Sequence, residues 1–211
     1  MFRGKNIYDC RRLDNLNIQK YILSKNLGYD KIELKKSNMI NLVPFLQKNF
    51  GEDCDCTLTS ISSCLYYWLN KTRTPQEVYF EVEKNARKYF YDGTKFGTIP
   101  IFIKNIYQEC ATNFQLDFKA QSHYIKGLGF TKDFLKAVLD YETPIILSFL
   151  NDGRDFYLSH SVTVVGYKNF LIKSKKLPDK IETVFCVYDN WNATISYIDF
   201  DVLSSISCIC Y

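Results

Sequence analysis

The sequence predicts an α+β protein with a helical front half that packs on a C-terminal antiparallel β-sheet. Three observations lead to this fold class. Apolar residues recur at helical spacing as far as about residue 140. After Pro144 they form short strand-like runs that are joined by polar turns. Helices that precede strands along the chain are typical of α+β domains, in which the helices cover one side of the sheet.

Composition narrows the class of protein further. The chain has 211 residues, of which 46% are hydrophobic and 24% charged, so it can bury one full core. The net charge of +4 is not concentrated in a basic block, which argues against a nucleic-acid partner. No apolar run approaches the roughly 18 to 20 residues of a membrane span, and the start lacks the apolar segment of a signal peptide. We therefore expect a cytoplasmic protein whose eight cysteines are mostly free thiols.

Helices are expected along most of the front half. Residues 1–40 carry apolar side chains at loosely helical spacing, which predicts an N-terminal helical cover ahead of a main domain over residues 41–211. The clearest local signal is the capping box of Thr74, Pro75 and Glu77. Helices are expected over residues 56–70, 74–91, 99–110 and 131–140.

Strands are expected in the back half, where apolar residues form short runs. They are predicted over residues 145–150, 161–167, 183–188, 194–200 and 205–211. The lysine-rich stretch 168–180 between two of them is expected to be a loop.

Three residues suggest chemistry when they are considered together. Cys56 begins a predicted helix, where free backbone N–H groups favour a thiolate. His160 begins a predicted strand, and Asp189 ends the next one, so antiparallel pairing can bring the two side by side. A thiol, an imidazole that takes its proton and a group that orients the imidazole form the usual arrangement of cysteine nucleophiles.

The segments around these residues resemble papain-like cysteine peptidases, and most closely the bacterial C39-like peptidases that process bacteriocins. The sequence DCTLTS at residues 55–60 is similar to the family's DCGPTA-type nucleophile segment, and HSVTVVGY at 160–167 is similar to its histidine strand. VYDNW at 187–191 resembles the last active-site strand, and YETPII at 141–146 resembles the element before the histidine.

The resemblance implies a papain-like fold over residues 41–211 and a thiol hydrolase that cleaves a peptide or other acyl bond through an acyl-enzyme. Cys56, His160 and Asp189 would be the catalytic residues, and Trp191 would shield the histidine from water. It implies no cofactor and no metal. The substrate would be a peptide or a small acyl compound, and a separate transporter or biosynthetic protein is a possible partner.

Two positions depart from the family pattern. Phe50 stands where the family carries the glutamine of its oxyanion hole, which leaves Gln47 and then Asn49 as candidates for that role. Thr57 and Leu58 replace the usual glycine and proline after the nucleophile. Because of these departures, a noncatalytic papain-like binding module stays open as an alternative, and so does a cysteine acyltransferase with the same three residues.

Other residues offer weaker alternatives. Cys54 competes with Cys56 as the nucleophile, and His123, expected in a loop or at the surface, is a fallback base. Two Cys-x-Cys pairs, at residues 54–56 and 208–210, could together form a zinc site, although their spacing is shorter than usual for zinc ligands.

Overall fold

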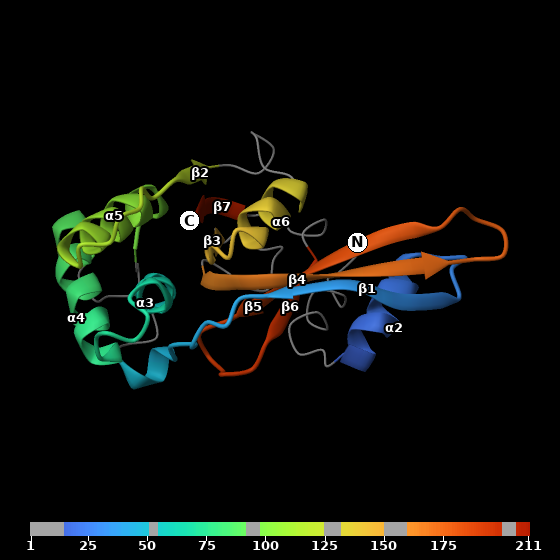
Figure 1. Cartoon of the computed structure of the whole chain (residues 1–211), viewed down its shortest axis with the longest axis horizontal. Helices are drawn as coiled ribbons and strands as arrows, with labels where there is room; N and C mark the ends of the chain where they lie inside the picture. Colours follow the sequence, from blue (N-terminus) through green and yellow to red (C-terminus); the bar gives the residue numbers. More distant parts are fainter. Residues whose placement is uncertain (1–14, 51–54, 92–97, 125–131, 150–159, 200–205) are drawn as a thin grey trace, which may run out of the picture.

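The helical end of the protein lies opposite a long β-arm, with a smaller sheet region between them (Figure 1). Helices α3, α4 and α5 form the helical end, whereas α2 and strands β1, β4 and β5 form the arm. The α+β class with its antiparallel sheet is therefore confirmed. The computed structural model describes residues 15–50, 55–91, 98–124, 132–149, 160–199 and 206–211.

Helix α3 is the central helix of the protein. Its first ten residues are all buried, because α4 and α5 cover one side while strands β3 and β4 cover the other. The capping box of Thr74 and Glu77 at the start of α4 is confirmed. The helices are α2 (Asn15–Lys25), α3 (Cys56–Trp68), α4 (Pro75–Ala86), α5 (Ile103–Asn113) and α6 (Lys132–Asp140), with short 3-10 turns η1 (Gln47–Asn49), η2 (Arg87–Tyr89) and η3 (Pro100–Phe102).

All strand pairs that the structure describes are antiparallel, and they form one sheet in the order β2-β7-β3-β4-β5-β6. Strand β4 is the longest: its first part pairs with β3, and its second part pairs with β1. The strands are β1 (Lys31–Met39), β2 (Ser122–Tyr124), β3 (Ile145–Phe149), β4 (Ser161–Lys173), β5 (Lys180–Tyr188), β6 (Ser196–Ile198) and β7 (Ile206–Cys210).

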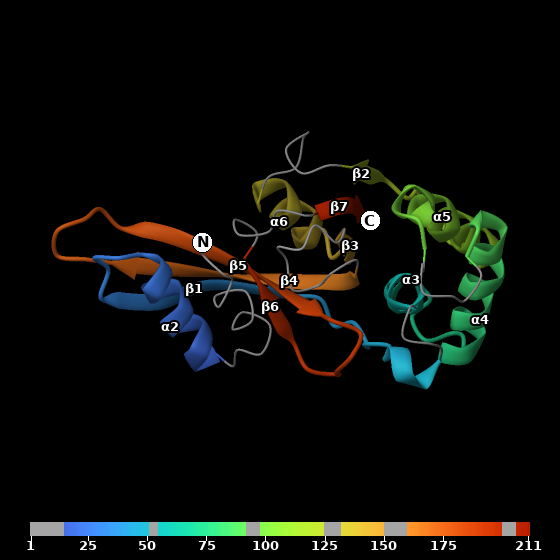
Figure 2. The ribbon, with the colours of Figure 1, turned by 180° about the vertical axis from the view of Figure 1, so that it is seen from behind.

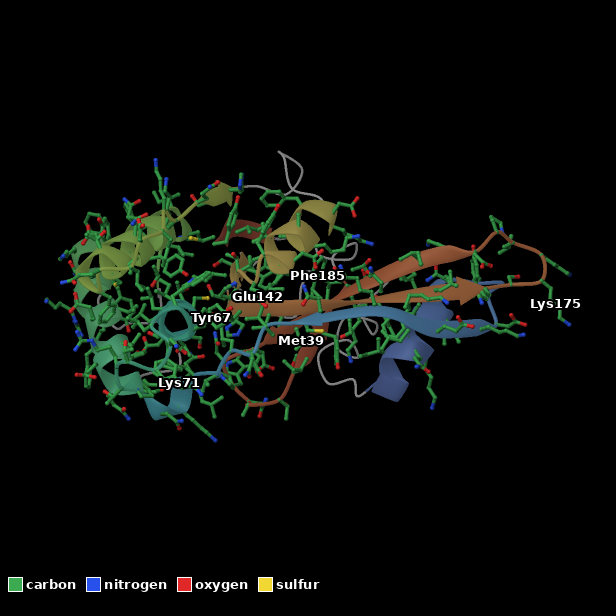
Figure 3. The ribbon with its side chains drawn as sticks, in the orientation of Figure 1. Met39, Tyr67, Lys71, Glu142, Lys175 and Phe185 are labelled. Carbon is green, nitrogen blue, oxygen red and sulfur yellow. The ribbon has the colours of Figure 1, made fainter. Side chains whose placement is uncertain are left out.

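Gly166 marks the point where β4 passes from β3 to β1. It pairs with Met39, and a Cβ atom at this position would clash with the backbone oxygen of Asn38. Met39 is labelled in Figure 3 near the middle of the molecule. Only glycine allows the two backbones to approach this closely, which gives the glycine of the histidine-strand motif a structural role.

The arm differs from the sequence expectation in two places. Residues 31–39 form strand β1 instead of continuing a helical cover, although α2 is helical as expected. The predicted loop over 168–180 shortens to 174–179, because β4 continues to Lys173 and β5 already starts at Lys180. Phe170 and Ile172 are buried in the core cluster that contains α2 residues, which explains why the strand continues. Figure 2 shows the arm from behind, and Figure 3 places Lys175 at its tip.

Candidate active site

The start of helix α3 lies against the start of strand β4. The Cys56 side chain, on the first residue of α3, is only 9% exposed. The backbone N–H of Ser161 donates a hydrogen bond to its sulfur over 3.4 Å. Ser161 directly follows His160, so the chain segments that carry these two predicted site residues, 104 positions apart in sequence, lie next to each other.

Burial raises the pKa of the Cys56 thiol above its usual value. Hydrogen bonds from Ser161 and Thr57 oppose this effect, but they are smaller than the cost of removing the charged form from water. Burial therefore opposes the thiolate that the helix N-terminus favours. Because the pKa is raised, attack by the sulfur requires a base that removes its proton.

His160 is oriented by a backbone carbonyl. Its ring is 6% exposed, and Nε2 lies 2.8 Å from the carbonyl oxygen of Asp189. Because a carbonyl only accepts, Nε2 must carry the hydrogen, which in a neutral ring leaves Nδ1 as the proton acceptor. Trp191 stacks on the imidazole with ring centroids 4.2 Å apart and is itself 38% exposed. The predicted partner of the ring and its predicted shield are therefore both beside it.

The Asp189 carboxylate has a different set of partners from its carbonyl. Oδ1 accepts the backbone N–H groups of Trp191 and Asn192, each over 3.1 Å, and Oδ2 accepts the Ser196 hydroxyl, also over 3.1 Å. The carboxylate therefore closes the turn that follows β5. The sequence pointed to a side-chain contact with the histidine, whereas the hydrogen bond to the ring comes from the main chain of the same residue.

The two oxyanion-hole candidates lie in different environments. Gln47 is buried in η1, and its backbone N–H donates to the Asn190 carbonyl over 2.9 Å, next to Asp189. Asn49 is exposed. Phe50 stacks on Tyr79 with ring centroids 5.1 Å apart, so an aromatic packing role replaces the family's glutamine at that position.

Sequence reasoning missed a chain of hydroxyl groups under the site. The Ser161 hydroxyl lies 2.8 Å from that of Thr57 and 2.7 Å from that of Ser148. This contact links α3, β4 and β3. Thr57 stands where the family has glycine, and that departure was the one signal in the sequence that pointed to this contact.

A buried carboxylate precedes the cysteine and was also missed. Asp55 accepts hydrogen bonds from the hydroxyls of Tyr79 and Tyr91, the first over 2.6 Å. Its backbone oxygen accepts from the N–H of Thr59, which belongs to the first turn of α3. These bonds fix the residue from which α3 starts, and with it the position of Cys56.

The weaker candidates lie elsewhere. His123 is on β2 at one edge of the sheet, with its Nε2 3.2 Å from the Tyr211 hydroxyl, so of the two expected positions, a loop or the surface, the loop is wrong. Cys54 and the side chain of Cys208 lie outside the described residues, whereas Cys210 is buried. Among the side chains that the structure describes, no three His, Cys, Asp or Glu residues are grouped to hold a metal ion.

One comparison with known protein families finds a match. The model of the Peptidase_C39 like family matches residues 39–201, a range that contains α3, His160 and Asp189. No curated protein matches the chain. In the described part of the chain, none of the helices has the length and apolar character required to cross a membrane.

Proposed function

Because this chain belongs to the Peptidase_C39 like family, of cysteine-peptidase type, we propose that it is a papain-like thiol hydrolase acting through Cys56, His160 and Asp189. The observation that carries the proposal is the hydrogen bond from Ser161 to the Cys56 sulfur, which brings the nucleophile to the residue next to the base. The bond cleaved is a peptide bond or another acyl bond.

In the proposed reaction His160 takes the thiol proton on Nδ1 while the sulfur attacks the substrate carbonyl. The tetrahedral intermediate collapses when the imidazolium returns that proton to the leaving amine, and a thioester on Cys56 remains. Water then attacks the thioester, with His160 as the base, and releases the acid. The Nε2 bond to the Asp189 carbonyl supports this scheme, because it leaves Nδ1 able to accept a proton.

Gln47 is the better candidate for the oxyanion hole. Its burial and its backbone bond to Asn190 support a position beside the site, whereas Asn49 is exposed. Together with the backbone N–H of Cys56, its amide would hold the developing negative charge. One such donor typically contributes about a hundred- to a thousandfold in rate.

The physiological setting follows from the same proposal. A cytoplasmic enzyme of this type would process a peptide or small acyl substrate, and a separate transporter or biosynthetic protein would use the product. We propose that residues 41–211 form the peptidase-like domain, to which residues 1–40 are an N-terminal addition.

A peptide-library assay tests the function directly. Mass spectrometry of the products should show cleaved peptides, and rapid acid quenching should trap a peptide fragment as a thioester on Cys56. Adding a primary amine distinguishes the alternatives: an acyltransferase forms the amide at the expense of the acid. Binding of peptides without any cleavage or thioester would contradict the proposal and favour a binding module.

The Asp189 side chain offers a sharper test of how the histidine is oriented. Asp189→Asn should lower kcat by no more than about tenfold, because an amide oxygen still accepts the two backbone N–H groups of the turn. Asp189→Ala should lower kcat more, since both N–H groups lose their partner. A loss of roughly 10⁴-fold in Asp189→Asn, as in triads where the carboxylate itself contacts the imidazole, would contradict orientation through the main chain.

A further inference from the structure

Asn190 bonds to every segment that forms the site. It follows Asp189 and is 0% exposed. Its Nδ2 lies 2.9 Å from the Cys56 carbonyl oxygen, 2.8 Å from the Ser161 carbonyl oxygen and 2.8 Å from the Ser60 hydroxyl. Its own carbonyl accepts the Gln47 N–H over 2.9 Å. One residue thus connects the nucleophile helix, the histidine strand and the turn with Gln47.

The side-chain amide of Asn190 replaces a backbone hydrogen bond between β4 and β5. The pairing of β4 with β5 ends at Thr163 and Tyr188. Beyond this pair the backbone of Asn190 adopts the left-handed conformation, with φ of 66°. Its side-chain amide donates a hydrogen bond to the Ser161 carbonyl, which in a longer ladder would accept a backbone N–H of β5. Asparagine tolerates this conformation better than most residues.

The acceptors around the Asn190 side chain determine which way its amide group faces. Two of its three acceptors are carbonyl oxygens, which only accept, so the nitrogen must face them. Oδ1 is buried and receives no hydrogen bond from the part of the chain that the structure describes. A buried oxygen without a donor costs free energy, so the bonds of the nitrogen are what this side chain contributes.

We infer that Asn190 is a positioning residue, which holds the Cys56 end of α3 at a fixed distance from the His160 end of β4. The inference rests on the proposed function, because the distance matters only if the two side chains exchange a proton. A displacement of about 1 Å between reacting groups can cost roughly a hundredfold in rate.

Asn190→Gly provides the cleanest test. Glycine keeps the left-handed backbone and the carbonyl that bonds Gln47, but it removes the amide. We expect kcat for a cleaved peptide to fall about a hundredfold while KM stays within about twofold. Asn190→Asp should be at least as slow, because a carboxylate would face two carbonyl oxygens. The control is Asn192→Ala, which removes an exposed side chain from the same turn and should leave kcat unchanged.

A second measurement does not depend on turnover. The chain has two histidines, so the NMR signal of the His160 Cε1–H can be followed with His123 as an internal reference. Asn190→Gly should shift the His160 signal and leave that of His123 in place. Should the wild-type protein cleave no peptide, the proposed function fails, and this signal alone decides the role of Asn190. An unmoved His160 signal, or a loss of kcat fully explained by unfolded protein in circular dichroism, would overturn the inference.

Discussion

Cys56→Ala should reduce peptide cleavage to the rate of the buffer alone, a loss of about 10⁴-fold or more. Without the sulfur no thioester can form, and no other described cysteine shares its position: Cys64, Cys110, Cys186 and Cys210 are all buried along other parts of the helices and strands. The measurement is the initial rate of product formation for a peptide that the wild-type protein cleaves.

The fold should survive this change, which a matched control can establish. Cys64 lies in the same helix and is fully buried, and burial raises the pKa of its thiol. Cys64→Ala should therefore lower the free energy of unfolding by about 1 kcal/mol yet retain activity in the folded fraction. Comparing Cys56→Ala with Cys64→Ala separates the loss of the nucleophile from the loss of packing in α3. Activity that survives Cys56→Ala but disappears in Cys54→Ala would transfer the nucleophile role to Cys54.

The sequence predicts the elements that side-chain patterns determine better than those that depend on backbone pairing with a distant segment. Helix α3 was predicted to within two residues because its apolar positions repeat at helical spacing. Strand β1 was missed because its residues are nearly all exposed and because the alternation of polar and apolar positions covers only residues 31–35, before a polar run. It is a strand because its backbone pairs with β4, a tertiary effect that local sequence does not express.

The candidate site shows the same division. Cys56, His160 and Trp191 could be singled out because they stand in a motif-like order in the sequence. The hydrogen bond between His160 and Asp189 uses a backbone carbonyl, a group that every residue has, so no sequence pattern could predict it. The role of Asn190 depends on a left-handed backbone and on three acceptors from distant segments, which exist only after folding.

His160→Ala is the second change for which we expect a large loss, of roughly a thousand- to ten-thousandfold in kcat. With the ring absent, the thiol loses its proposed base, and burial has already raised its pKa above the usual value. The pH profile should change accordingly. In the variant the remaining activity should keep rising with pH through the alkaline range, because hydroxide must then deprotonate a sulfur whose pKa burial has raised. The wild-type profile should lack this alkaline dependence.

Two controls make the result specific to the ring. His123→Ala removes the other histidine, which lies on the edge strand β2, and should leave both the rate and the pH profile unchanged. Free imidazole should partly restore His160→Ala, because Trp191 stacks on one face of the space that the ring would vacate. If His160→Ala kept the wild-type profile while His123→Ala lost activity, the base would have to be assigned to His123, and the proximity of Ser161 to the Cys56 sulfur would then have only a structural meaning.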